Sequence, residues 1–258
     1  MERIILIETS TALCSTALSE NEAIVSYRES SAPKAHASLT AVFIQEMLSE
    51  RGLTIEDCDA VSVSMGPGSY TGLRVGVSTA KGLCFGSGKP LLAVGTLDTL
   101  VAQADDAAHD LTDGLKYIIP MVDARRMEVY TAVFENGVQT TQTAPAIIDE
   151  NSFADLLEQG PCLFIGDGAG KCADVIKHPN ARFCQCWPKA SAMLAPAMKA
   201  YKEKRFEDVA YFEPFYLKEF VATVSKKKLF KKLVNQLSER FLIYYLAVNK
   251  FSVADYVS

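Results

Sequence analysis

The stretch M-G-P-G-S-Y-T-G-L-R-V-G-V-S-T-A-K-G-L-C-F-G, residues 65–86, decides how this chain folds. The residues just before it, 60–65, alternate between apolar and polar side chains, as a strand does. The dense glycine and proline of residues 66–68 must end that strand in a turn. Ser69 is a suitable N-cap for a following helix. The stretch therefore predicts a strand, a glycine-lined turn and a helix over about residues 70–85.

Small residues form a stripe along this predicted helix, because Gly72, Gly76 and Ala80 recur at a spacing of four. A glycine inside a helix costs about 1 kcal/mol relative to alanine. The simplest compensation is another backbone that packs very close to the stripe. We therefore interpret this side of the helix as a docking surface.

A second predicted helix, residues 38–51, carries more apolar surface than one sheet can cover. Its apolar residues are spread over more than one face, although a helix on a sheet needs only one apolar face. The surplus again indicates docking. The residues that we predict to bind a partner on the two helices are His36, Leu39, Phe43, Met47, Tyr70, Gly72, Leu73, Gly76 and Ala80.

A glycine turn at a helix start could instead hold a phosphate. Residues 83–90 and 165–172 both come near the Walker pattern G-x-x-x-x-G-K-[ST], but each lacks the first glycine and the final hydroxyl residue. A strand followed by a glycine turn is more often only a turn, so neither segment predicts a phosphate loop.

The sequence G-P-G-S-Y-T-G-L-R-V-G at residues 66–76, followed by A-K-G-L at residues 80–83, resembles the signature of the bacterial TsaB (YeaZ) family. The resemblance extends to residues 4–10, 123–130 and 214–218. Proteins of this family take part in making threonylcarbamoyladenosine in tRNA. The resemblance implies an accessory protein without catalysis or cofactor, which pairs with a TsaD-like catalytic subunit and works with a TsaE-like ATPase. It also implies a homodimer in isolation and contact with tRNA only through the complex.

The fold class follows from an internal repeat. Residues 117–137 repeat the pattern of residues 4–27: a buried strand, a turn led by an acid, an alternating strand and a Glu-Asn turn. Coincidence between two meanders is the alternative. A duplication of this kind is typical of the actin-like, sugar-kinase-like (ASKHA) fold, which has two similar α/β domains. A strand at residues 90–94 completes a β-α-β crossover, so we expect mixed sheets.

We place the first domain, with the dimerisation helices, at residues 1–106 and the second at 107–225. The last helix of the second domain is free to pack back on the first. Residues 226–258 carry seven basic and two acidic residues and predict a basic amphipathic helix. This extension departs from the family, whose members usually end near residue 230, so the resemblance does not assign it.

Composition sets the broad class. The chain has 258 residues and a net charge of −5, which argues against a broad nucleic-acid-binding face. Its seven cysteines contain no C-x-x-C pair, which indicates reduced thiols in the cytoplasm. No apolar run is long enough for a signal peptide or a membrane span.

No catalytic constellation can be named from the residues. The three histidines have no partner at metal-ligand spacing, and Thr40 replaces the second histidine of the H-x-x-x-H pair that the TsaD paralogue uses. We therefore expect no metal site and reject a metallopeptidase. The alternative function is an independent ATP-dependent enzyme of the ASKHA fold or a glycopeptidase-like hydrolase.

Glu8 and Asp123 follow the first strand of each repeat, where the ASKHA fold often has an acid that organises Mg-ATP. A carboxylate that accepts hydrogen bonds from turn N–H groups is the commoner arrangement. Arg125 and Arg126 could hold a phosphate or a partner carboxylate, although exposed turn arginines are usually solvated. The residues that would line a vestigial nucleotide cleft are Glu8, Thr9, Asp123, Arg125, Gly166 and Gly168.

Overall fold

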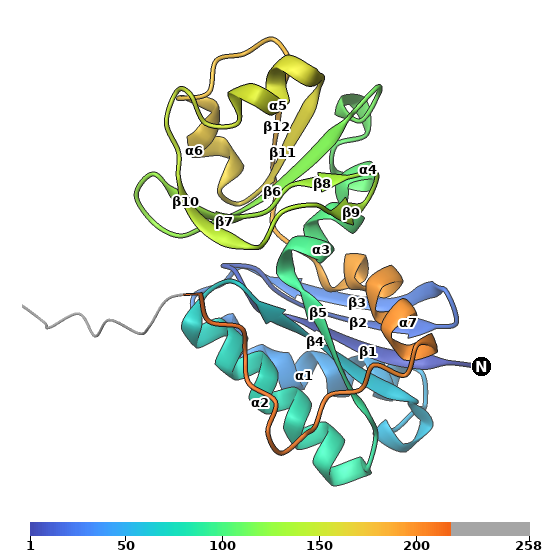
Figure 1. Cartoon of the computed structure of the whole chain (residues 1–258). Helices are drawn as coiled ribbons and strands as arrows, with labels where there is room; N and C mark the ends of the chain where they lie inside the picture. The colour runs from blue at the N-terminus through green and yellow to red at the C-terminus, as the bar shows by residue number, and fades with distance from the viewer. Residues whose placement is uncertain (218–258) are drawn as a thin grey trace, which may run out of the picture. The chain divides into compact units, whose positions relative to one another are not determined.

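The computed structural model describes residues 1–217. Its first half contains a five-stranded sheet with the order β3-β2-β1-β4-β5 (Figure 1). The first three strands form an antiparallel meander, and β4 and β5 follow β1 in parallel. The mixed sheet that the β-α-β crossover predicts is therefore confirmed. The strands are β1 (Arg3–Glu8), β2 (Cys14–Glu20), β3 (Ala23–Ser30), β4 (Ala60–Gly66) and β5 (Leu91–Gly95).

The second sheet repeats this topology with the order β10-β7-β6-β11-β12. Again three strands are antiparallel and two follow in parallel. The difference lies in the meander, where short strands β8 and β9 pair beside the Glu-Asn turn and continue the directions of β7 and β10. The predicted duplication is confirmed. The strands are β6 (Tyr117–Asp123), β7 (Glu128–Thr131), β8 (Phe134–Glu135), β9 (Val138–Gln139), β10 (Ala144–Ile147), β11 (Cys162–Gly166) and β12 (Ala181–Gln185).

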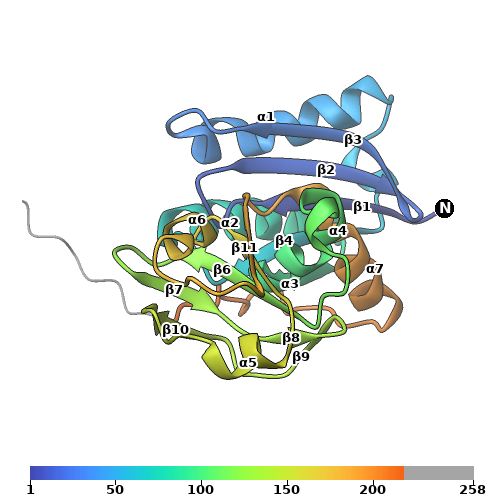
Figure 2. The same cartoon turned by 90° about the horizontal axis from the view of Figure 1, so that it is seen from above.

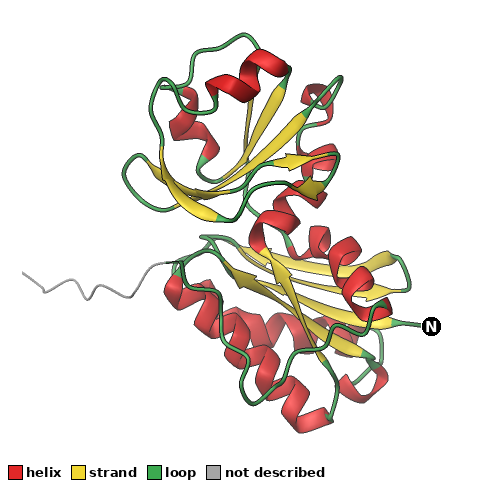
Figure 3. Cartoon of the chain, viewed as in Figure 1, coloured by secondary structure: helices red, strands yellow, loops and turns green. Residues whose placement is uncertain are grey.

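Helices cover both faces of the first sheet (Figure 3). Successive side chains of β1 point to opposite faces, so Ile5 and Ile7 pack against α1 and α2, while Ile4 and Leu6 pack against η3 and α7. Helix α1 lies beside β3 (Figure 2). The helices are α1 (Ala35–Glu50), α2 (Tyr70–Ser87), η3 (Ala190–Met193) and α7 (Leu194–Lys202), with a short η1 (Ile55–Asp57) before β4.

The second sheet is covered by α5 and α6 on one face and by α3 and α4 on the other. Helix α3 therefore belongs by sequence to the first half but packs on β6 and β11, while α7 from the second half packs on the first sheet. The domain boundary near residue 106 stays a prediction, and the extension at 226–258 lies outside the described residues. The helices are α3 (Thr96–Ala102), α4 (Ala104–Ala107), η2 (His109–Leu111), α5 (Ala154–Gln159) and α6 (Ala169–Ala173).

Helix α1 begins at Ala35 rather than at the predicted Ser38. The residue before it, Lys34, has a φ of 66° and makes no side-chain cap, so the sequence holds no capping signal at the true start. Helix α2, in contrast, begins where Ser69 predicts, because the Ser69 hydroxyl accepts a hydrogen bond from the Gly72 N–H at 3.3 Å.

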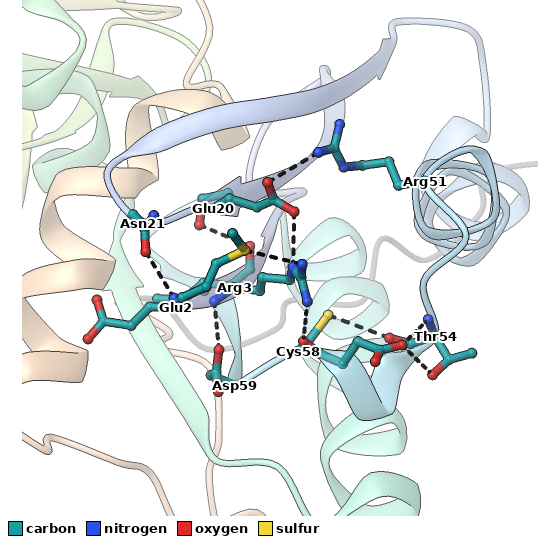
Figure 4. Close-up of polar contacts among 12 residues, drawn as sticks. Glu2, Arg3, Glu20, Asn21, Arg51, Thr54, Cys58 and Asp59 are labelled. Atoms are coloured by element: carbon teal, nitrogen blue, oxygen red, sulfur yellow. Dashed lines mark hydrogen bonds and ion pairs between the residues drawn. The ribbon is translucent and has the colours of Figure 1, made fainter.

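A polar network around Arg3 holds the end of the first sheet at which β1 begins (Figure 4). Its Nε donates to Glu20 Oε1 at 3.0 Å, and Arg51 donates to the other oxygen of Glu20 at 3.2 Å. The Arg3 backbone N–H donates to Asp59 Oδ2 at 2.7 Å. The network links β1 to the end of β2, to the residue that follows α1 and to the loop before β4.

The opposite end of the sheet is held by a contact between two backbones. A Cβ atom on Gly72 would lie 2.1 Å from the carbonyl oxygen of Thr9, and one on Gly76 would lie 2.2 Å from Thr9 Oγ1. Likewise, a Cβ on Gly68 would lie 2.2 Å from the carbonyl oxygen of Ser10. These distances are far below van der Waals contact. Gly68 and Gly72 face backbone carbonyl oxygens, so glycine is required at both positions, whereas a side chain at Gly76 would displace the Thr9 hydroxyl group.

This contact corrects part of our docking prediction. The close backbone neighbour of the glycine stripe is the turn after β1 of the same chain, not a partner. Gly72, Leu73, Gly76 and Ala80 are all buried on that side of α2. They complete the core of the first half and have no surface left for docking.

The contact predicts opposite effects of one substitution at two positions of α2. Gly72→Ala should lower the free energy of unfolding by at least about 2 kcal/mol, because the new methyl group collides with a backbone carbonyl. Gly82→Ala is the matched control, because no atom lies within 4 Å of a Cβ there. It should stabilise the protein by up to about 1 kcal/mol through helix propensity. Urea unfolding measures both, and a Gly72→Ala variant of wild-type stability would contradict the packing.

Candidate functional site

Glu8 ends β1 and is completely buried. Its Oε1 accepts a hydrogen bond from the Ser10 N–H at 2.6 Å, which is the turn arrangement given above as the commoner one. Among the described residues Oε2 has no hydrogen-bond partner. Burial, with a smaller contribution from the negative charge of Asp167, raises the pKa of Glu8 to about 7.

The three residues that follow Glu8 also carry buried hydroxyl groups without hydrogen-bond partners in the described part of the chain. Thr9 Oγ1, Ser10 Oγ and Thr11 Oγ1 are buried and have no hydrogen-bond partner among residues 1–217. Buried polar atoms in proteins are nearly always paired with protein groups or ordered water. Water is therefore the simplest partner for these oxygens.

The second half places Asp123 and Asp167 side by side. Asp167 Oδ1 accepts a hydrogen bond from the Asp123 N–H at 2.9 Å. Burial raises the pKa of Asp167 to about 6. The negative charge of Asp167 also raises the pKa of Glu8, although much less than burial does. Sequence reasoning missed Asp167, although it lies inside the glycine-rich segment at residues 165–172.

The glycines and the lysine of that segment serve internal packing. A Cβ on Gly166 would lie 2.3 Å from the Met121 carbonyl oxygen, and the Gly168 N–H donates to the same oxygen at 2.9 Å. Lys171 Nζ forms an ion pair with Asp123. It also donates hydrogen bonds to the carbonyl oxygens of Arg126 at 2.8 Å and of Glu128 at 2.7 Å. The near-Walker lysine thus supports a turn of its own chain.

The structure brings the predicted cleft residues together in two groups. Glu8 and Thr9 form the buried turn of the first half, and the other four lie around the turn after β6. Asp123 and Arg125 are exposed. Among residues 1–217, no group of three or more His, Cys, Asp and Glu side chains could hold a metal ion.

The predicted partner-binding residues divide into buried and accessible ones. Met47 is only 1% exposed and belongs to the core, which corrects its assignment. His36 is half-buried and its Nε2 forms a hydrogen bond with the Thr11 carbonyl oxygen at 2.9 Å. The half-buried Tyr70 ring lies 4.6 Å from the ring of Tyr216. Leu39 and Phe43 of α1 are also half-buried.

Two exposed apolar residues of these helices were missed. Val42 of α1 is 42% exposed and Phe85 at the end of α2 is 87% exposed. Phe85 lies inside the stretch that opened our sequence analysis, and its size and apolar character in a helix were the available signal. None of the helices in residues 1–217 has the length and hydropathy needed to span a membrane.

Comparisons with known proteins agree with this architecture. Residues 30–226 match the family model described as TsaD, tRNA N6-adenosine threonylcarbamoyltransferase. The chain is 29% identical to the tRNA threonylcarbamoyladenosine biosynthesis protein TsaB of Escherichia coli, over 85% of this chain and 96% of that protein. It is 31% identical to the protein of the same name from Bacillus subtilis, over 83% and 93%.

A solved structure supports the fold. YeaZ from Pseudomonas aeruginosa superposes with a TM-score of 0.73 over 84% of this chain and 100% of that chain, at 24% identity. Together with the repeated sheet topology, this match confirms the expected α/β fold of two similar halves with mixed sheets.

The buried position of Glu8 makes stability depend on pH. Its pKa is raised in the folded state from 4.5 to about 7, so the folded protein holds the proton more tightly than the unfolded chain. The contribution of Glu8 should therefore be most favourable below pH 4.5 and fall as the pH rises to 7. Glu8→Gln should remove this decline, and raise the free energy of unfolding at pH 8 by up to about 3 kcal/mol.

Urea unfolding of both proteins between pH 5 and 8 measures this difference. Glu29→Gln is the control, because Glu29 is an exposed glutamate of the same sheet. If the free energy of unfolding changed with pH in the same way for wild type and Glu8→Gln over this range, the raised pKa of Glu8 would be contradicted.

Proposed function

This chain belongs to the TsaB family of tRNA threonylcarbamoyladenosine biosynthesis proteins, and we propose that it is the non-catalytic partner of a TsaD-like threonylcarbamoyltransferase. It docks through the outer sides of α1 and α2, with a second copy of itself in isolation and with the catalytic subunit in the working complex. A TsaE-like ATPase joins the same assembly, and tRNA is reached within the complex.

The observation that carries this proposal is the apolar surface of the two helices. Their inner sides are filled by the first sheet, yet Val42 and Phe85 remain exposed. Leu39 and Phe43 of α1 are also only half-buried. Large apolar side chains gathered on one pair of packed helices are typical of protein interfaces.

The state of the cleft residues supports a role without catalysis. Phosphoryl transfer needs a loop that cradles phosphates and a cation to neutralise them. Here the glycines at residues 66–76 hold the turn after β1, and Lys171 is engaged by its own turn. These groups stabilise the fold, so they are not free to bind a nucleotide.

The alternative, an independent ATP-dependent enzyme, draws on one observation. Glu8 Oε2 and three neighbouring hydroxyl groups are buried without a hydrogen-bond partner among the described residues, which also suits a bound polar ligand. We prefer water as the partner, because Glu8 is completely buried.

We also place the protein in the cytoplasm. All seven of its cysteines are free thiols, and burial raises the pKa of Cys58, Cys84, Cys162 and Cys172 to about 11. Unreactive buried thiols are compatible with a reducing compartment.

The proposed docking surface predicts that two negative charges introduced on it weaken binding of the partner. Val42→Glu combined with Phe85→Glu should weaken binding of the TsaD-like subunit at least about tenfold, because each glutamate must be desolvated in the interface. The fold should be unaffected, since both side chains are exposed. Val138→Glu with Ile147→Glu is the matched control, because these residues are 67% and 78% exposed in the second half.

Sedimentation velocity and a titration with the catalytic subunit measure this effect. Wild-type assembly of the Val42→Glu, Phe85→Glu protein would remove the proposed docking surface. Equal weakening by the control pair would show a general charge effect instead.

A separate assay distinguishes the two functions. The purified chain alone should release no phosphate from ATP above a buffer blank, since its near-Walker lysine is engaged. Glu8→Gln serves as the comparison. If the wild-type protein hydrolysed ATP and the Glu8→Gln variant did not, the chain would be the ATP-dependent enzyme of the alternative function.

A further inference from the structure

The turn between β6 and β7 carries two adjacent arginines, Arg125 and Arg126 (Figure 1). Both are exposed. Within residues 1–217 neither guanidinium group takes part in a hydrogen bond or an ion pair, although the backbone of both residues does. No other lysine or arginine occurs between residues 127 and 170. Lys171 and Asp123 also lie at this turn, but they form an ion pair with each other, so the two arginines are its unpaired charges among the described residues.

Both arginines have left-handed backbone conformations, with φ of 72° at Arg125 and 51° at Arg126. This region costs about 1 kcal/mol or more for a residue with a Cβ, whereas glycine or asparagine enters it more easily. Arginine at both positions is therefore unfavourable for the turn itself. The side chains, rather than the backbone, account for their presence.

The turn that presents them is braced from within. Lys171 Nζ donates to the Arg126 carbonyl oxygen at 2.8 Å, and the Arg125 N–H donates to Asp123 Oδ1 at 3.0 Å. The Ala124 N–H donates a hydrogen bond to the carbonyl oxygen of Glu128 at 3.0 Å, which closes the turn. A preorganised turn loses little backbone entropy when its side chains bind a ligand.

The chemistry of this pair suits phosphate. A guanidinium group binds phosphate oxygens through two parallel hydrogen bonds and keeps its charge at any physiological pH. Two guanidinium groups on neighbouring residues can bind two neighbouring phosphates of one strand. A single carboxylate of a partner protein would need only one guanidinium group. The other charges matter as well, because residues 1–217 contain 18 basic and 28 acidic residues. Such a body repels nucleic acid, so a contact needs a local cationic point.

We propose that Arg125 and Arg126 contact the phosphodiester backbone of the tRNA when this protein is part of the assembled transferase complex. This inference rests on the proposed function and adds a direct tRNA contact to it. Because phosphate contacts carry no sequence information, the pair orients the tRNA and does not select it.

The experiment compares tRNA binding by the complex of the full chain and the TsaD-like subunit at several salt concentrations. Arg125→Gln with Arg126→Gln should weaken tRNA binding about tenfold or more, and lower the slope of log affinity against log salt by about 1.5 to 2. Lys204→Gln with Arg205→Gln removes another exposed adjacent basic pair and should change neither quantity.

Each outcome decides the inference. Wild-type affinity and salt slope in a complex that assembles normally would overturn the tRNA contact and leave the proposed function standing. Loss of assembly with unchanged tRNA affinity of the remaining complex would assign the pair to a carboxylate of the catalytic subunit and also overturn it. Failure of the wild-type proteins to assemble at all would overturn both proposals.

Discussion

The close approach of two backbones, the turn after β1 and the first turns of α2, is the constraint on which the first half depends. Gly68 in the turn before the helix and Gly72 in its first turn lie against the carbonyl oxygens of Ser10 and Thr9 at distances that exclude a side chain, and Gly76 lies against the Thr9 hydroxyl group. The Ser69 N–H donates to the Ser10 carbonyl oxygen at 2.6 Å and fixes the helix start on the same turn. With its inner side set in this way, α2 presents the opposite side, together with α1, to the surroundings.

Local signals predicted the elements that build this contact. The strand, the glycine turn and the Ser69 cap are properties of a few neighbouring residues, and the structure reproduces them. The duplication was also predictable, because each repeat carries its own pattern of apolar residues and turns. The glycine stripe indicated that a backbone lies close, but spacing holds no information about which backbone that is. The assignment to a partner was wrong for this reason.

The site was predictable only in part, since it depends on contacts between distant segments. The hydrogen bond from the Ser10 N–H to Glu8 is local and followed from the turn. The effect of the Asp167 charge on Glu8 depends on how the chain folds, which no local sequence pattern reports. Lys171 looked like a degenerate phosphate-binding residue, yet its actual role, bracing the arginine turn, requires strands that only the folded sheet brings together.

The exchange of helices between the halves has a consequence for how the protein is made. The strands that carry Ile4, Leu6, Leu92 and Val94 leave the ribosome early, but the helix that covers this side of them ends only at Lys202. During most of translation, the apolar face of the first sheet that packs against η3 and α7 therefore remains exposed to solvent. Slow elongation across the second half would lengthen the period during which chaperones have to shield it.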